Sequence, residues 1–206
     1  MNGEIIDVYK TIAEVSEAIY TEKRSKFISF AIPVENQYEI KQHLERLQKE
    51  YYDARHICYA YMLGKDRKDF RANDNGEPSG TAGKPILGQI NSNELSDILI
   101  VVIRYFGGIK LGTSGLIVAY REVAAEAIRN ATIIDRIVKS EIEMTFEYPF
   151  LNGVMKVIKD EDVDIVTQTY DMDCYMKISV RDSLKEQVEN KLLKVETLSI
   201  INNDTE

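Results

Sequence analysis

The clearest structural signal in the chain lies in residues 97–131, DILIVVIRYFGGIKLGTSGLIVAYREVAAEAIRNA. The continuous apolar, β-branched run in residues 97–106 predicts a strand that is buried on both faces. The alanine-rich pattern of residues 116–131 predicts a helix with one face on a core. Residues 107–115 between them predict a glycine-rich turn, so a strand leads directly through glycines into a helix.

This order of elements indicates an anion site. The first backbone N–H groups of a helix have no partner within it, and they lie at the positive end of its dipole. Hydroxyl groups and positive charge would add to that field. The candidate residues are Arg104, Tyr105, Gly107, Gly108, Lys110, Gly112, Thr113 and Ser114. The alternative is that the glycines only make tight turns and that Thr113 or Ser114 only caps the helix.

A second polar segment, residues 73–85, reads NDNGEPSGTAGKP and contributes Asp74, Glu77, Ser79, Thr81 and Lys84. It lies within residues 64–88, where frequent glycines and two prolines predict one long loop. A hydrolase set of Ser79, His56 and Asp74 lacks a nucleophile elbow, and one histidine with Asp74 and Glu77 is a weak metal set. We therefore expect no catalytic residues, no metal and no cofactor, and the alternative role of these side chains is to bond the loop to the body.

The residues before these motifs predict three more elements. Residues 25–33 predict a strand, residues 35–51 a helix, and residues 57–63 a second strand that Arg55 and His56 precede. Alternation along that second strand places Tyr59 and Tyr61 on one face of the sheet and His56 on the other. The aromatic residues of these segments, Tyr59, Tyr61, Tyr105 and Tyr120, either stack on nucleic-acid bases or pack inside the protein.

The last third of the chain predicts a separate domain. Strands are expected at 141–146, 163–170, 174–180 and 195–201, with helices at 149–159 and 182–193. The order βαββαβ is that of the ferredoxin-like fold. The chain is therefore expected to be α+β, with one domain at residues 1–135 and a ferredoxin-like domain at residues 136–206.

Charge and composition narrow the classes of function. The net charge of −8 argues against a general nucleic-acid coat protein. Residues 1–135 carry 17 Lys and Arg against 19 Asp and Glu, and residues 136–206 carry 9 against 15. The first part can thus carry a local basic face, whereas the second is a poor partner for phosphates. Two distant cysteines and no apolar run of membrane-spanning length predict a cytoplasmic protein with reduced thiols and no membrane contact.

Four segments in this order resemble the YigZ/IMPACT family: SKFI at 25–28, ARHICYAY at 54–61, NDNGEPSGTAGKPIL at 73–87 and VVIRYFGGIKLGTSGLIVAY at 101–120. The resemblance extends over residues 22–130 and is weaker from residue 137 onward. The chain looks like a two-domain bacterial YigZ-type protein, a type without the RWD domain of the eukaryotic IMPACT proteins.

The resemblance implies a first domain like domain two of ribosomal protein S-five, followed by a ferredoxin-like domain, a pair similar to the C-terminal domains of elongation factor G. It also implies a role in translation and the stress response. The eukaryotic relatives are translational regulators that compete for a ribosome-associated activator of the amino-acid-starvation kinase.

We therefore expect a non-catalytic protein that contacts RNA, the ribosome or a ribosome-associated protein. Its basic residues would be Arg55, Lys84, Arg104, Lys110 and Arg121. One alternative is an enzyme that binds a small phosphorylated or nucleotide ligand, and another is a protein–protein adaptor. The oligomeric state is left open by the sequence.

Overall fold

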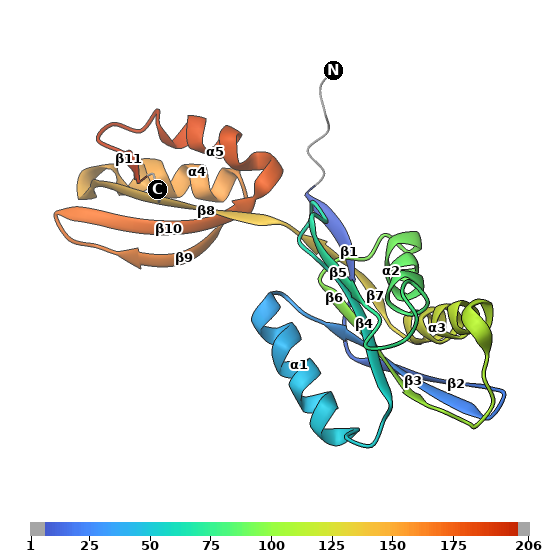
Figure 1. Cartoon of the computed structure of the whole chain (residues 1–206). Helices are drawn as coiled ribbons and strands as arrows, with labels where there is room; N and C mark the ends of the chain where they lie inside the picture. Colours follow the sequence, from blue (N-terminus) through green and yellow to red (C-terminus); the bar gives the residue numbers. More distant parts are fainter. Residues whose placement is uncertain (1–6, 202–206) are drawn as a thin grey trace. The chain divides into compact units, whose positions relative to one another are not determined.

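The computed structural model describes residues 7–201, and its contacts divide the chain into two units (Figure 1). The first unit spans residues 9–136, and the second comprises residues 137–201 together with residues 7 and 8. The outer ends of the two expected domains, residues 1–6 and 202–206, lie outside the described residues. That the units are domains with their boundary at residues 135 and 136 stays a prediction.

The first unit is built on a five-stranded antiparallel sheet in the order β2-β3-β6-β4-β5. The strands are β2 (Ser16–Glu22), β3 (Ser25–Pro33), β4 (His56–Leu63), β5 (Asp69–Asn73) and β6 (Ile98–Tyr105). The central strand, β6, is the one whose continuous apolar run predicted burial on both faces. All six residues from Ile98 to Ile103 are buried, which confirms that prediction.

Helices cover both faces of this sheet (Figure 1). Helix α1 (Gln37–Glu50) packs on one face through Ile40 and Leu47, over the odd-numbered residues of β6. Helices α2 (Gly83–Ser92) and α3 (Gly112–Arg129) pack on the other face, over the even-numbered residues of β6. Because side chains alternate along a strand, Arg104 shares the face of α3, whereas Tyr105 shares the face of α1.

The prediction of one long loop over residues 64–88 is wrong. This stretch contains β5, and α2 begins in its second half. Strand β5 is a short edge strand with exposed or half-buried residues, so it has no apolar alternation to reveal it. Helix α2 contains Gly83, Pro85 and Gly88, which lower its helical propensity, yet Ile86 and Ile90 bury its inner face.

The second unit has the predicted ferredoxin-like arrangement. Its strands β8 (Lys139–Glu147), β9 (Asp164–Thr169), β10 (Asp173–Arg181) and β11 (Ser199–Ile201) form an antiparallel sheet in the order β11-β8-β10-β9. Helices α4 (Leu151–Asp160) and α5 (Lys185–Leu192) lie on one face of it (Figure 1). The apolar residues that alternate along β8 and β10 form the core beneath them.

A separate two-stranded sheet joins β1 (Val8–Ile12) to β7 (Ile133–Ile137). These strands and β2 are additions to the predicted elements. The α+β class and the expected two-part architecture are confirmed. Within the described part of the chain, none of the helices combines the length and apolar character needed to cross a membrane.

Candidate functional site

A cavity of about 580 Å³ opens where β4 and β6 meet the start of α3. Strand register places His56 of β4 opposite Arg104 of β6, so two side chains from different sequence segments share one end of the sheet. The turn after β6 and the first turn of α3 form the other wall. The lining residues are Arg55, His56, Glu77, Pro78, Arg104, Phe106, Lys110, Leu111, Gly112, Thr113 and Leu116.

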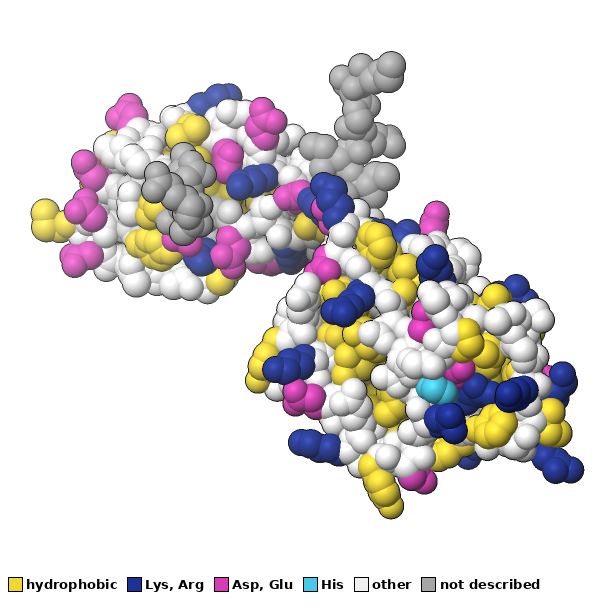
Figure 2. Space-filling model, viewed as in Figure 1, with side chains coloured by type: hydrophobic (Ala, Val, Ile, Leu, Met, Phe, Trp, Pro, Cys, Tyr) yellow, Lys and Arg dark blue, Asp and Glu magenta, His cyan; other side chains and the backbone are white. Residues whose placement is uncertain are grey.

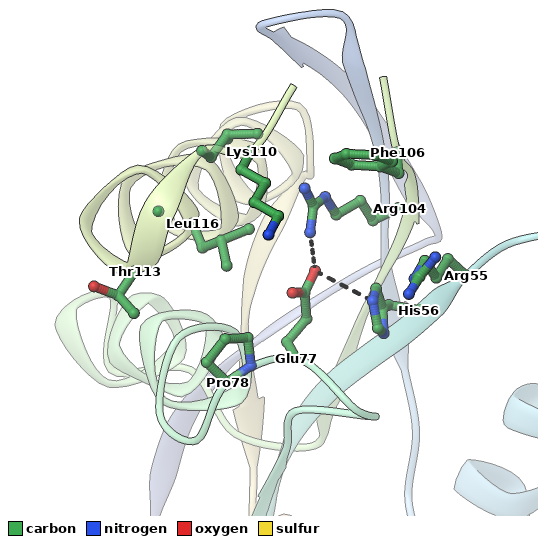
Figure 3. A pocket seen from close by; sticks show the side chains of 11 residues that line it. Arg55, His56, Glu77, Pro78, Arg104, Phe106, Lys110, Thr113 and Leu116 are labelled. Atoms are coloured by element: carbon green, nitrogen blue, oxygen red, sulfur yellow. Dashed lines mark hydrogen bonds and ion pairs between the residues drawn. The ribbon is translucent and has the colours of Figure 1, made fainter. Parts of the chain in front are cut away.

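The carboxylate of Glu77 is the centre of a buried polar network at the base of this cavity. Its Oε1 accepts a hydrogen bond from Arg104 Nη1 at 2.5 Å (Figure 3). The same oxygen accepts one from the Tyr120 hydroxyl at 2.9 Å. Glu77 is 8% exposed, Arg104 6% and Tyr120 0%. Ion pairs this deeply buried are expensive to break, because the remaining charge would be left without a partner.

The guanidinium of Arg104 lies between aromatic rings. Its Cζ is 5.5 Å from the ring centre of Phe27 and 5.7 Å from that of Phe106, which are cation–π distances. Arg104 Nη2 also reaches Ser25 Oγ at 3.5 Å, the outer limit of a hydrogen bond. Among residues 7–201, none accepts a hydrogen bond from the buried Arg104 Nε.

His56 presents one ring nitrogen to the cavity. Its Nδ1 lies 2.8 Å from the carbonyl oxygen of Asn75, and a carbonyl can only accept, so Nδ1 carries the proton. Its Nε2 lies 4.0 Å from Glu77 Oε1 (Figure 3). The Asn75 carbonyl, in the polar segment of residues 73–85, thus fixes the orientation of the ring. Nε2 is left to accept or donate a hydrogen bond toward the cavity.

Tyr120 supports the network from below and cannot reach a ligand. Burial raises the pKa of its hydroxyl, as does the neighbouring Cys58, so Tyr120 stays protonated and donates to Glu77. The Cys58 thiol in turn donates to the Tyr120 oxygen at 3.3 Å. Burial raises the pKa of Cys58 to about 12, which makes this thiol a packing group and not a nucleophile.

The polar segment of residues 73–85 is held together by Asp74. Its Oδ1 accepts from the backbone N–H of Ala82 at 3.0 Å and of Gly83 at 2.8 Å, and its Oδ2 accepts from Gly80 at 2.8 Å. Burial opposes ionisation, but these three backbone donors lower the pKa of Asp74 below its usual value. Asp74 therefore acts as a remote carboxylate cap on α2, which has no cap from its own adjacent side chain.

The glycine-rich segment of residues 104–115 makes a turn that requires glycine at several points. Gly108 has φ +84° and Gly112 has φ +76°, both in the left-handed region. A side chain at Gly107 would collide with the backbone of Arg24 and Ser25, and Gly107 N donates to Ser25 Oγ at 3.2 Å. The glycines thus hold the turn after β6 against the β2–β3 hairpin.

After these glycines, α3 begins at the cavity, and no side chain caps its first N–H groups. Thr113 and Ser114 therefore do not cap the helix, and Figure 3 shows the Thr113 hydroxyl turned away from the cavity charges. Lys110 is exposed and points toward Arg104 and Glu77. In Figure 2, several Lys and Arg side chains gather around a histidine on the visible face of the first unit.

The structure brings together only part of the predicted site. Seven predicted residues line the cavity: Arg55, His56, Glu77, Arg104, Lys110, Gly112 and Thr113. Ten do not line it: Asp74, Ser79, Thr81, Lys84, Tyr105, Gly107, Gly108, Ser114, Tyr120 and Arg121. Tyr105 is on the opposite face of the sheet, with its hydroxyl on Asp53, and Arg121 pairs with Glu122.

The apolar lining was missed by sequence reasoning: Pro78, Phe106, Leu111 and Leu116. Phe106 is 44% exposed although it directly follows β6, the most apolar strand, and that position near Arg104 is the one signal that could have identified it. Of the remaining three, Pro78 lies in residues 73–85, Leu111 in residues 104–115 and Leu116 in α3, and none of them carries polar chemistry. In the described part of the chain, no three side chains of the metal-binding types come together.

Residues 23–128 match the family model of the Impact N-terminal domain. IMPACT family member YvyE of Bacillus subtilis is 34% identical over 152 residues, which is 74% of this chain and 70% of that protein. IMPACT family member YigZ of Escherichia coli is 33% identical over 160 residues, which is 77% of this chain and 78% of that protein.

A solved crystal structure of a hypothetical protein superposes with a TM-score of 0.74 at 28% sequence identity. The alignment covers 98% of this chain and all of the other. The similarity therefore extends across both units, beyond the residues that the family match covers.

Proposed function

The chain belongs to the IMPACT family, and from that premise we propose that it is a non-catalytic binding protein linked to translation. Its ligand is RNA, held by phosphate at the cavity of the first unit. One observation carries the proposal: the basic side chains of Arg55, Arg104 and Lys110 line a cavity that the uncapped start of α3 enters.

The groups that line this cavity can each interact favourably with a phosphate. The first N–H groups of α3 and the positive end of its dipole favour an anion. Lys110 and Arg55 are exposed and can contact a phosphate directly, and such contacts supply most of the sequence-independent affinity of nucleic-acid-binding proteins. The exposed ring of Phe106 offers a surface on which a base can stack.

The link to translation rests on the family resemblance, because the eukaryotic relatives are expected to be translational regulators. The contact with RNA is assigned to the first unit, since residues 136–206 carry a charge of −6. A ribosome-associated protein is the other partner that this role allows, and it would not require phosphate contacts at Lys110.

The first experiment measures binding of a fluorescein-labelled single-stranded RNA by anisotropy at several salt concentrations. The Arg55→Glu, Lys110→Glu double variant should bind at least tenfold more weakly than the wild type, and the salt dependence of its binding should be shallower. The matched control is Lys41→Glu, Arg46→Glu, which makes the same charge change on exposed positions of α1. Equal loss in both variants would show that net charge, and not the cavity, governs binding.

A second arm tests the role in translation. The wild-type protein should co-sediment with ribosomes at low salt and dissociate as salt is added, whereas the double variant should stay at the top of the gradient. Absence of the wild type from ribosomal fractions at every salt concentration would remove the link to translation. RNA binding would then be judged from the anisotropy measurement alone.

The cavity also favours a second candidate, an enzyme acting on a small phosphorylated ligand. Its volume of about 580 Å³ lies in the range of small-molecule sites, and His56 Nε2 faces it with the proton fixed on Nδ1. Incubation with nucleotides and analysis of the products would test this. Turnover that His56→Asn abolishes would establish the enzyme in place of the binding protein.

A further inference from the structure

We propose that the cavity takes a phosphomonoester, the terminal phosphate of a nucleotide, in preference to a phosphodiester within an RNA strand. The inference deepens the proposed function and rests on it for the nucleotide that carries the phosphate. Two sources share this chemistry: a phosphorylated RNA end and a free mononucleotide.

The first argument is the balance of charge around the cavity. Its lining holds three cationic side chains, Arg55, Arg104 and Lys110, and a single carboxylate, Glu77. Three positive charges less one negative charge leave two positive charges, with His56 counted as neutral. A phosphomonoester carries about −1.5 to −2 near neutral pH, whereas a phosphodiester carries a single negative charge. The monoester is therefore the better electrostatic match.

The second argument is the closed base of the cavity. Glu77, Arg104 and Tyr120 are buried and bonded to one another, so a strand cannot pass between them. An internal phosphodiester continues into a sugar on both sides. A terminal phosphate continues on one side only, so it can approach the closed base while the rest of the nucleotide lies toward the exposed side chain of Phe106.

The third argument is the donor capacity of Arg104, which is independent of the α3 start. This residue is 6% exposed, and no described residue accepts from its Nε. Nε itself is too deeply buried to meet a ligand, but a guanidinium has five N–H donors, and Nη2 makes only the 3.5 Å contact with Ser25 Oγ beside the Nη1 bond to Glu77, so donor capacity remains at the wall of the cavity. Figure 3 shows this guanidinium, the Lys110 amine and the His56 ring directed toward the same space around Glu77.

His56 adds a difference that a diester cannot exploit. In the neutral ring, Nε2 is an acceptor, because Nδ1 holds the proton against the Asn75 carbonyl. A phosphomonoester in its singly charged form has a P–OH that can donate to Nε2. A phosphodiester has no proton to give.

The test compares one RNA sequence with three kinds of end: a 5′-phosphate, a 3′-phosphate, or hydroxyl groups at both ends. Anisotropy is measured with the full-length protein, and AMP and adenosine serve as competitors. At least one phosphorylated end should bind ten times more tightly than the hydroxyl-ended RNA, and AMP should compete where adenosine does not. Arg55→Ala, Lys110→Ala should remove this preference, whereas Lys41→Ala, Arg46→Ala should retain it.

The outcomes separate the inference from the proposed function. Equal binding of all three RNAs, with AMP no better than adenosine, would overturn the inference and leave RNA binding intact. Binding of AMP without binding of any RNA would overturn the proposed function and support a phosphomonoester site for a free nucleotide. Failure of AMP and of all three RNAs to bind would overturn both.

Discussion

Helix α2 begins within the glycine-rich residues 73–85, and helix α3 begins within the glycine-rich residues 104–115. Their starts differ in how the first N–H groups are satisfied. The start of α2 is already satisfied by the chain itself, because Asp74 accepts from Gly80, Ala82 and Gly83. The start of α3 has no side-chain cap and opens on a cavity with basic residues. The start of each helix favours a negative charge. In α2 the Asp74 carboxylate supplies that charge, whereas at α3 a ligand could supply it.

The contrast extends to the rest of each motif. In residues 73–85 the carboxylates face inward, toward α2 and toward Arg104, so this motif is largely the frame of the site. In residues 104–115 the exposed charge of Lys110 faces the cavity, and the glycines set the direction of the turn. The two motifs are similar in glycine content and polarity. The partners of their charged groups show which motif supports the site and which one offers a surface for a ligand.

The largest expected effect comes from removing the anchor between the two motifs. Glu77→Ala leaves the buried guanidinium of Arg104 without its carboxylate, which should lower the free energy of unfolding by about 3–5 kcal/mol. Urea denaturation followed by circular dichroism measures it. Glu77→Gln keeps an acceptor oxygen for Tyr120 and should lose less than Glu77→Ala. A loss below about 1 kcal/mol in Glu77→Ala would show that the motifs are joined by packing alone.

An intermediate effect is expected from exposing the start of α2. Asp74→Ala leaves three backbone donors without their acceptor and should cost about 1–3 kcal/mol of unfolding free energy. Asp74→Asn, which keeps one acceptor oxygen, is the matched control and should cost less. Wild-type stability in Asp74→Ala would mean that other acceptors replace the carboxylate, and the contrast between the two helix starts would disappear.

The same carboxylate gives this prediction a pH dependence. The pKa of Asp74 is lower in the folded chain than its usual value of 3.8, so its stabilising contribution is complete at higher pH. That contribution is lost as pH falls through the folded pKa. The stability difference between wild type and Asp74→Asn should therefore be constant at neutral pH and shrink below pH 3.8. Denaturation curves across acidic pH would reveal any other trend.

The smallest expected effect comes from giving α3 the carboxylate that α2 already has. Thr113→Asp places a negative charge in the exposed first turn of α3 and should raise the free energy of unfolding by about 0.3–1 kcal/mol. The same charge should weaken RNA binding several-fold, because it competes for the field that attracts phosphate. Thr113→Asn is the neutral control for both measurements. Stabilisation with unchanged RNA affinity would show that phosphate binds elsewhere.

Sequence predicted the elements whose signals are local. The apolar run of β6, the alanine-rich α3 and the apolar stripe of α1 each depend on residues close in the chain, and all three are present. Helix α2 was missed because the carboxylate at its start comes from Asp74, eight residues before Ala82, and is invisible to a search for adjacent caps. Strand β5 was missed because it is an exposed edge strand without alternation.

The site was predicted as a region and not as an arrangement. Arg104 and Lys110 were identified as basic groups of equal standing, but strand register buries Arg104 against Glu77 and leaves Lys110 exposed. Tyr120 was grouped with the other aromatic residues, for which stacking on bases and packing inside the protein were both left open, and the helix phase turns it fully inward. These distinctions depend on which face of a sheet or helix a residue occupies after distant segments have paired.

One contact, that of Ser25, also sets an order of events during synthesis. Its hydroxyl receives the backbone N–H of Gly107, which is made 82 residues later. Strands β3 and β4 are neighbours of β6 on either side, so neither has its central partner until β6 has been translated. The cavity first exists in a chain that extends through the start of α3. A ligand that binds there would therefore distinguish a chain whose synthesis has passed the start of α3 from a shorter one.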